Sequence, residues 1–575
     1  MLEVIGIELD AALVADWQAR VGRARARLGW DVSAPCVARR HASGASLAVA
    51  APFDQLFTAT EVNEWALCAA LHERDPGHWC GLRNALRAAV EATDANPTSL
   101  LPPEIDEPAA LARLERIAAA EARPALQTLV AGAVSRELPW LLDDETLSLG
   151  DGVGGRSFPL TDLPQAEVVP WSALRAVPTA LVTGSNGKTT TVRLLAACLR
   201  AQGWRPGYCC TDGVFVDSAA VATGDYSGPA GARRVLRDER VEAAVLETAR
   251  GGILRRGLAV TRVDAAVVTN VSADHFGEYG IHDLGALADV KLTVGAVVRP
   301  GGVLVLNADD PMLRAKAPGL EQRFGRCPDI AWFAADADDP FLVGHRAAGG
   351  ATCGARAGRL WLSAGSSDCD LGELAAMPLT VGGVARYNVA NLAAAALAAV
   401  ALGVTPATVA AVFAQFGSRV EDNPGRLMRF DLDGVRVLVD YAHNAEGMRG
   451  FLEVAQSLRA ADGRLGLLLG HAGNREDRDI ERLAEVAAEF RPALVVVKEL
   501  EGYLRGRQPG EVPGILRAAL LRAGLPEAGL AMRPTELEAV RSALEWARPG
   551  DVLALPVHGL AARAATLDLL QSRKT

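Results

Sequence analysis

The sequence has no long apolar run and no start resembling a secretion signal. Half of its 575 residues are hydrophobic and 22% are charged, a composition typical of a globular chain. The longest stretch rich in alanine, leucine and valine, "NVANLAAAALAAVALGV", predicts one buried helix rather than a membrane span. The first residues, "MLEVIGIELD", carry acidic groups where a secretion signal has basic ones. We therefore expect no membrane partner and a cytoplasmic location.

The sequence also lacks an excess of positive charge and a cysteine framework. Its net charge is −10 with 59 basic residues, which argues against a nucleic acid partner. Its nine cysteines are scattered, and the close pair Cys209 and Cys210 is not a C-x-x-C motif. We expect no zinc site and no set of disulfides, because reduced thiols are the simpler interpretation of such spacing.

What the sequence does contain is a repeated alternation of strand, glycine turn and helix. The first 170 or so residues mix amphipathic helices with short apolar runs and carry no recognisable chemical motif. From Thr179 onward, "TALVTG" predicts a strand, a glycine turn and then a helix that ends near Gly203. The later runs "VEAAVLET", "VDAAVVTNV" and "GGVLVLNADD" each end in polar residues. This pattern predicts a buried parallel sheet whose ligands bind beyond the strand ends.

The alternation restarts after "DNPGRLMRF", which predicts a second α/β unit and a boundary near residue 424. We therefore predict an α/β fold of three domains: an α+β N-terminal domain over residues 1–175, a P-loop domain with a mostly parallel sheet over 176–423, and a Rossmann-like C-terminal domain over 424–575.

The stretch "GSNGKTT", which begins at Gly184, predicts a phosphate-binding loop. The usual pattern G-x-x-x-x-G-K-[ST] would need glycine at Val182, so the glycine spacing here is shorter. Glycines let the backbone N–H groups at a helix N-terminus approach a phosphate, and Lys188 would reach the terminal phosphates. Thr189 or Thr190 could offer a hydroxyl to Mg²⁺. The alternative is an ordinary strand-to-helix turn that happens to contain Gly-Lys-Thr.

Polar residues at the other strand ends are further candidates, and each has a simpler alternative. Glu247 could hold a metal or could be a solvated cap. Asn270, Asp274 and His275 could serve a metal site or form a structural pair. Asn307, Asp309 and Asp310 could bind ribose or a base, or could cap the following helix. Lys291 lies in an apolar helical stretch, where a lysine is normally a snorkelling surface residue.

With these residues in place, the chain resembles the Mur ligase family, and most closely the C-terminal ligase half of cyanophycin synthetases. The resemblance covers roughly residues 178–560. Its motifs recur in order: "GSNGKTT", "TDG", "ETARGGILRRG", "NVSADH", "LNADD", "RYNVANLAAA", "PGR", "DYAHN", "GNREDRD" and "RGRQPGE". The family's own loop, "GTNGKTT", has the shorter glycine spacing, which accounts for Val182.

The resemblance implies an ATP- and Mg²⁺-dependent ligase that phosphorylates an acceptor carboxylate and joins an amino acid or other amine to it. The implied ATP-binding residues are Gly184, Ser185, Asn186, Gly187, Lys188, Thr189, Thr190, Asn307, Asp309, Asn388, Arg426, Asp440 and His443. The implied metal ligands are Thr189, Glu247, His275 and, if carbamylated, Lys291. The implied catalytic residues are Lys188, His275, Lys291 and Arg426. Weaker candidates for the amine substrate are Asn444, Arg475, Asp477, Arg505 and Arg507.

The chain also departs from cyanophycin synthetases, which carry an ATP-grasp domain before the ligase half. About 175 residues precede the loop, too few for an N-terminal domain and a full ATP-grasp module. We therefore expect one active site, with a small-molecule amino acid and a carboxylate-bearing peptide or polymer as substrates. The N-terminal region could bind the acceptor or build a homo-oligomer.

Three alternatives remain. A folylpolyglutamate-synthase-like or cell-wall-precursor ligase is disfavoured by "ETARGGILRRG", which is a cyanophycin-type motif. A catalytically inactive nucleotide-binding regulatory subunit would be expected to have lost residues such as Lys188 and Glu247, which are present. A generic P-loop kinase or GTPase accounts for the first motif but for none after Asp274.

Overall fold

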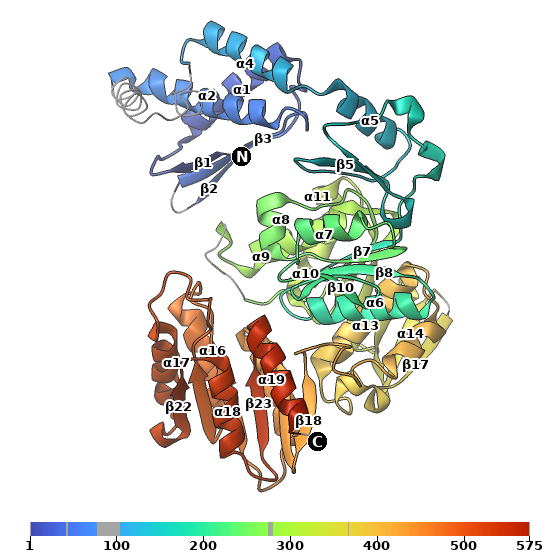
Figure 1. Ribbon diagram of the computed structural model, residues 1–575, viewed down its shortest axis with the longest axis vertical. Helices are drawn as coiled ribbons and strands as arrows, with labels where there is room; N and C mark the ends of the chain where they lie inside the picture. Colours follow the sequence, from blue (N-terminus) through green and yellow to red (C-terminus); the bar gives the residue numbers. More distant parts are fainter. Residues whose placement is uncertain are drawn as a thin grey trace. The chain divides into compact units, whose positions relative to one another are not determined.

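The computed structural model describes residues 2–41, 44–77, 104–273, 276, 280–365 and 367–573 of the chain. They fall into two compact units, Met1–Arg136 with Pro159–Val169 and Glu137–Phe158 with Pro170–Thr575 (Figure 1). Both units combine helices with strands, so the predicted α/β fold class is confirmed. No helix in the described ranges has both the length and the apolar composition needed to cross a bilayer.

The first unit is an α+β fold built around two buried tryptophans. Trp17 and Trp65 lie in helices α1 and α2 and are 0% and 1% exposed. Helix α1 begins after Asp10, whose carboxylate accepts a hydrogen bond from the backbone N–H of Leu13 at 2.7 Å. The antiparallel sheet of this first unit has the strand order β1-β3-β2. The elements are β1 (Leu2–Ile5), α1 (Ala11–Leu28), β2 (Cys36–His41), β3 (Gly44–Val49), α2 (Leu56–Arg74), α4 (Glu107–Glu121) and α5 (Pro124–Val134).

A small sheet of order β4-β5-β6 leads into the second unit. Its strands are β4 (Trp140–Leu142), β5 (Thr146–Leu149) and β6 (Arg156–Pro159). The Arg237 guanidinium donates to the Ser148 hydroxyl at 2.8 Å, to the Thr146 carbonyl at 3.1 Å and to the Asp143 carboxylate. These contacts join residues 143–148 to the end of helix α7 (Pro229–Leu236), within the second compact unit. The domain boundary at residue 175 stays a prediction.

The second unit contains an 11-stranded sheet of order β10-β9-β8-β11-β7-β12-β13-β14-β15-β16-β17. The strands from β8 to β15 in this order are parallel. At each edge two further strands follow, and each of them is antiparallel to its inner neighbour. The strands are β7 (Thr179–Thr183), β8 (Pro206–Cys210), β9 (Gly213–Val216), β10 (Ala219–Thr223), β11 (Ala243–Glu247), β12 (Val263–Val268), β13 (Val298–Asn307), β14 (Asp329–Asp336), β15 (Thr352–Arg356), β16 (Arg359–Ala364) and β17 (Ser367–Glu373).

Helices cover both faces of this sheet because alternate residues of its central strands point to opposite faces. In β7, Ala180 and Val182 pack with helices α6, α13 and α14, while Leu181 packs in the core with α7, α9 and α10. The helices are α6 (Lys188–Ala201), α7 (Pro229–Leu236), α8 (Arg250–Arg256), α9 (Leu284–Leu292), α10 (Pro311–Lys316), α11 (Leu320–Phe324), α12 (Pro340–Ala347), α13 (Arg386–Ala401) and α14 (Pro406–Phe413). The alanine-rich stretch forms α13, which confirms the predicted buried helix.

The C-terminal part, drawn in orange to red in Figure 1, forms a sheet of order β18-β19-β23-β20-β21-β22. Strand β18 is antiparallel to β19, and the remaining pairs are parallel, so the predicted second α/β unit is confirmed. Helices α15 to α17 pack on one face, and α18 and α19 on the other. The elements are β18 (Met428–Leu432), β19 (Val435–Asp440), α15 (Ala445–Leu458), β20 (Leu465–Leu469), α16 (Asp477–Glu489), β21 (Leu494–Lys498), α17 (Glu511–Arg522), β22 (Leu530–Arg533), α18 (Glu536–Trp546), β23 (Val552–Pro556) and α19 (Leu560–Ser572).

Candidate active site

The glycine loop between β7 and α6 has a backbone that only glycine can provide at two positions. Gly184 and Gly187 have φ values of +148° and +83°. A Cβ atom on Gly184 would lie 1.8 Å from the Thr269 hydroxyl, and one on Gly187 would lie 2.2 Å from the amide oxygen of Asn391. Any larger residue would therefore push the loop away from its neighbours.

The segment after β12 holds this loop in place. The backbone N–H of Ser185 donates to the Asn270 carbonyl at 2.9 Å, and that of Asn186 donates to the Asn270 side chain at 2.8 Å. The Asn270 amide in turn donates to the Asn186 carbonyl at 3.2 Å. The loop is thus fixed before any ligand binds.

Three oxygen-bearing side chains meet beside the loop. Thr189 donates its hydroxyl to one carboxylate oxygen of Glu247 at 2.8 Å, and Thr211 donates to the other at 3.0 Å. Glu247 is 1% exposed, and burial raises the pKa of its carboxyl group, while Lys188 and the two hydroxyls oppose that shift. Lys188 donates to the carbonyls of Gly184 and Ser185, both at 3.1 Å.

These residues line a cavity of about 310 Å³ that the middle and C-terminal parts of this unit share. Most of the predicted nucleotide residues lie on its wall: Ser185, Asn186, Gly187, Lys188, Thr189, Thr190, Asn307, Asp309, Asn388, Arg426, Asp440 and His443. Asn388 is buried, donates to the Leu379 carbonyl at 3.0 Å and accepts from Asn391 at 3.0 Å. Asp309 accepts a hydrogen bond from the Ala335 backbone at 2.6 Å.

Arg426 brings a positive charge to this cavity from the C-terminal side. Its guanidinium lies 4.2 Å from the centre of the Tyr441 ring. Its Nη1 atom is buried and finds no hydrogen-bond acceptor among the residues that the structure describes. A buried cationic donor without an acceptor is costly, so this atom fits a cavity that receives an anionic ligand.

Buried polar contacts tie the two sides of the cavity together. The side-chain amide of Asn444 donates to the Asn186 oxygen at 3.0 Å, and the Asn444 oxygen caps α15 through Gly447. Asp212 forms an ion pair with Arg563 of α19 and lies 3.2 Å from Arg193. Burial alone would raise the Asp212 pKa, but the surrounding guanidinium groups hold it below its ordinary value.

A second cavity of about 530 Å³ adjoins the first, and Ser185, Lys188 and His443 line both. Among its described lining residues it has one carboxylate, Asp225, and six lysine or arginine side chains: Lys188, Arg250, Arg255, Arg256, Lys291 and Arg505. Gly184 lies on its wall as well. Lys291 is only 3% exposed, so the snorkelling interpretation of this lysine is wrong.

The structure does not bring the predicted amine-site residues together in one cavity. Arg505 lines the second cavity, whereas Arg475 and Asn444 line a separate cavity of about 270 Å³. Arg507 pairs with Asp477 at 2.6 Å and donates to the carbonyls of Gly473 and Arg475. Arg507 and Asp477 therefore stabilise a loop. His275 and Asp274 lie outside the described residues.

Sequence reasoning gave no role to several residues of the site. Thr211 belongs to the "TDG" motif at the end of β8, so its place on a neighbouring strand could have pointed to Glu247. Asn391 follows Asn388 by three residues in the same helix, and this spacing could have predicted that the two side chains contact each other. Arg563 gave no signal, because its partner Asp212 is 351 residues away in the chain.

The donor set fits a hard cation in part. Thr189 and Glu247 place oxygen atoms beside Lys188, and oxygen is the ligand type that Mg²⁺ prefers. Within the described residues, no three histidine, cysteine, aspartate or glutamate side chains form a group that could hold a metal. A magnesium ion here would therefore draw on hydroxyl groups and on phosphate oxygens, and the role of His275 as a ligand stays a prediction.

Comparison with known proteins gives two family matches. The family model of the Mur ligase middle domain matches residues 182–337, and that of the Mur ligase glutamate ligase domain matches residues 425–555. A cyanophycin synthetase of Synechocystis sp. is 36% identical over 369 residues, which are 64% of this chain and 41% of that protein. This chain thus spans about two fifths of the length of that relative.

Two further relatives are more distant. A UDP-N-acetylmuramoyl-L-alanyl-D-glutamate–2,6-diaminopimelate ligase of Geobacter metallireducens is 28% identical over 405 residues, which are 67% of this chain and 74% of that protein. The solved structure of E. coli FolC in complex with DHPP and ADP has a TM-score of 0.52 at 17% identity, covering 69% of this chain and 89% of that one. The last similarity is one of fold.

Proposed function

Since the chain belongs to the Mur ligase family through its middle and glutamate ligase domains, we propose that it is an ATP-dependent ligase with one active site. It activates a carboxylate of a peptide-like or polymeric acceptor and joins an amino acid or another amine to it. The observation that carries the proposal is the pair of adjoining cavities with a shared wall of Ser185, Lys188 and His443. Because the reaction consumes ATP, we place it in the cytoplasm.

The smaller cavity receives ATP. The loop amides at the start of α6 and the Lys188 ammonium face the phosphates, and Arg426 supplies the buried Nη1 that has no acceptor among the described residues. Asn307, Asp309 and Asn388 line the same cavity and are placed for the nucleoside. The fold similarity to E. coli FolC, which was solved with ADP, supports this assignment.

Thr189 and Glu247 are the described residues that would hold a magnesium ion, with His275 and a carbamylated Lys291 as predicted additions. Such an ion, when bound, offsets the negative charge of the phosphates. Lys188 and Arg426 add to that effect through their own positive charges. The buried Glu247 carboxylate, held by Thr189 and Thr211, keeps a fixed position beside the loop.

The larger cavity receives the acceptor. Without Lys291, five lysine and arginine side chains against one described carboxylate favour an anionic molecule, and the shared wall of the two cavities supports an acceptor carboxylate next to the terminal phosphate. Two anions approach each other here, so Lys188 and Arg250 reduce their repulsion. The same positive charges would disfavour a cationic acceptor.

The chemistry follows from the poor leaving group of a carboxylate. A carboxylate oxygen attacks the terminal phosphorus of ATP, the bond to ADP breaks, and an acyl phosphate forms. The amine nitrogen then attacks the acyl carbon, loses a proton, and releases phosphate that carries the former carboxylate oxygen. Enclosure by residues from both domains, such as Lys188 and Arg426, would keep water away from the acyl phosphate.

The test is a phosphate-release assay with ATP, Mg²⁺, a panel of amino acids and short acidic peptides. We expect release to rise when both an acidic peptide and a suitable amino acid are present, and a peptide heavier by one amino-acid residue to appear by mass spectrometry. Nucleotide binding without turnover across a broad panel would instead support an inactive regulatory subunit. Release that no acceptor stimulates would contradict the ligase.

A further inference from the structure

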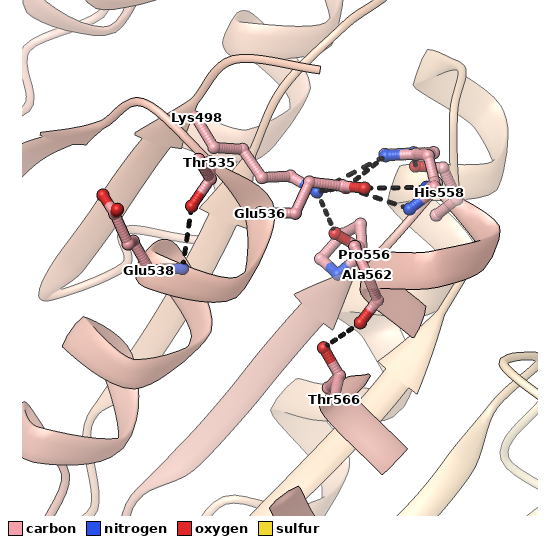
Figure 2. A network of polar contacts seen from close by, with 10 residues as sticks. Lys498, Thr535, Glu536, Glu538, Pro556, His558, Ala562 and Thr566 are labelled. Atoms are coloured by element: carbon pink, nitrogen blue, oxygen red, sulfur yellow. Dashed lines mark hydrogen bonds and ion pairs between the residues drawn. The ribbon is translucent and has the colours of Figure 1, made fainter. Parts of the chain in front are cut away.

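A second buried ionic cluster lies at the carboxyl edge of the C-terminal sheet. Lys498 ends β21, Glu536 begins α18, and His558 follows β23 (Figure 2). Their exposed fractions are 0%, 2% and 7%. None of these residues lines the two cavities assigned to the substrates.

Hydrogen bonds close this cluster on itself. The Lys498 ammonium donates to the Glu536 carboxylate and to the Pro556 carbonyl, the latter at 2.5 Å (Figure 2). The same carboxylate accepts from the backbone N–H groups of His558 at 3.0 Å and Gly559 at 2.7 Å. The ion pair thereby fixes the turn that follows β23.

The neighbours of the His558 ring determine which of its nitrogens carries the proton. Nδ1 lies 3.4 Å both from the Lys498 ammonium, which can only donate, and from a Glu536 carboxylate oxygen, which can only accept, so the neighbour of the other ring nitrogen decides the role of Nδ1 in the neutral ring. Nε2 lies 3.3 Å from the Ala442 carbonyl, which can only accept, so Nε2 carries the hydrogen. The Lys498 ammonium then has one acceptor for each of its three hydrogens. Burial and the adjacent Lys498 lower the pKa of His558, which favours this neutral form.

His558 in this way connects the ionic cluster to the wall of the nucleotide cavity. Ala442, which accepts its hydrogen bond, lines that cavity together with Tyr441 and His443. The His558 ring also meets the Tyr441 ring edge-on, with centroids 5.2 Å apart. Tyr441 in turn lies under the Arg426 guanidinium.

We propose that Lys498, Glu536 and His558 are positioning residues for the nucleotide site. They hold the Tyr441–Ala442–His443 segment, and through Tyr441 the Arg426 guanidinium, in the geometry that binds the nucleotide phosphates. The inference rests on the proposed function, because it assumes that the smaller cavity binds a nucleotide.

Two substitutions of His558 separate positioning from bulk packing. His558→Gln places an amide nitrogen where Nε2 was and keeps the donor to Ala442. His558→Asn reaches only the Nδ1 position, so it keeps a partner for Lys498 and loses the donor to Ala442. One lost hydrogen bond corresponds to a change in affinity of about three- to tenfold.

The experiment measures ADP binding by calorimetry and hydrogen exchange over residues 440–447 in the full chain. We expect His558→Asn to weaken ADP binding by about three- to tenfold and to speed exchange in this segment, and His558→Gln to stay within about twofold of wild type. Both variants should melt within a few degrees of wild type.

The outcomes against the inference are distinct from those against the function. Wild-type-like binding and exchange in both variants, or equal losses in both with a lowered melting temperature, would overturn the positioning role alone. Wild-type protein that binds no ADP would overturn the nucleotide site and the inference with it.

Discussion

Two groups of charged side chains differ in how completely the protein satisfies their hydrogen bonds: the open cluster of half-buried Lys188 and Arg426 at the first cavity, and the closed, buried cluster of Lys498, Glu536 and His558. In the C-terminal cluster, each hydrogen of the Lys498 ammonium has an acceptor, and Glu536 accepts from two backbone groups as well. In the cavity, Lys188 donates to backbone carbonyls, and Arg426 has a buried Nη1 without an acceptor among the described residues. A closed network stabilises the fold, whereas incompletely paired charges around a cavity indicate a ligand.

The largest effect should come from the open cluster. Lys188→Ala should lower ATP turnover by about 10²–10³-fold or more, because it removes a cation placed at the transferring phosphate. The melting temperature should change little, since among the described residues the ammonium donates hydrogen bonds to two carbonyls of its own loop. Phosphate release and thermal melting check both parts.

Lys316→Ala is the matched control, because this half-buried lysine pairs with Asp289 away from both cavities. It should leave turnover unchanged. If Lys188→Ala turns ATP over at the wild-type rate, the loop assignment is wrong.

The closed cluster should respond in the opposite way. Glu536→Gln leaves the Lys498 ammonium buried without a counter-charge, which should lower the free energy of unfolding by about 3–5 kcal/mol. The double variant Lys498→Met/Glu536→Gln removes both charges and keeps an acceptor for one of the two backbone N–H groups, so it should recover part of this loss. Urea unfolding followed by tryptophan fluorescence measures the difference; equal losses in the single and double variants would show that the ion pair is not the cause.

Arg426→Met should separate binding from stability within the open cluster. It should weaken ATP binding by about 10–100-fold, since a hydrogen bond to a charged group contributes about 1.5–3 kcal/mol. Stability should fall only slightly, because the change removes a buried donor that has no acceptor among the described residues together with a charge that lowers the pKa of Asp212 and opposes the rise in the pKa of Glu247. Calorimetric titration with ATP and thermal melting check the two parts, and a destabilised variant with normal ATP affinity would reverse our assignment.

Asp151 provides a smaller test of the rule that a buried charge without a partner is costly. This buried carboxyl group has no ionic partner among the described residues. Burial raises its pKa to about 7. The folded protein therefore binds this proton more tightly than the unfolded chain does, and stability should fall as pH rises from about 4 towards 7 and then level off. Asp151→Asn should remove this fall in the free energy of unfolding, which amounts to about 1–3 kcal/mol between pH 5 and 8. Melting temperatures of both proteins between pH 5 and 8 measure it; parallel profiles would contradict the assignment.

The sequence was most informative where the chemistry is local. The glycine turn from Gly184 to Thr189 between a strand and a helix could be predicted because its glycines and the helix start lie within a few residues, and its phosphate binding stays a prediction. Glu247 and Asn307 could be predicted because polar residues at the ends of parallel strands reach one edge. The resemblance to Mur ligases and cyanophycin synthetases, inferred from the same motifs, is confirmed by the family matches.

The sequence was least informative where distant segments meet. Some contacts form only when separate strands and helices pack, so the spacing of residues in the sequence does not predict them. Examples are the ion pair of Asp212 with Arg563 and the cluster of Lys498, Glu536 and His558. Lys291 shows the same limit, since its apolar helix neighbours do not reveal that it is buried. The roles of His275 and of Arg505 in catalysis and substrate binding stay predictions.

The most direct test of the account is the origin of the oxygen atoms in the released phosphate. Acidic peptides labelled with ¹⁸O in their carboxylates are incubated with the protein, ATP, Mg²⁺ and the amino acid panel, and the phosphate is analysed by mass spectrometry. Activation of an acceptor carboxylate requires that one carboxylate oxygen leaves with each phosphate, so we expect one ¹⁸O atom per turnover. Peptide-stimulated phosphate without ¹⁸O, or no stimulated phosphate from the panel, would contradict the proposed ligase.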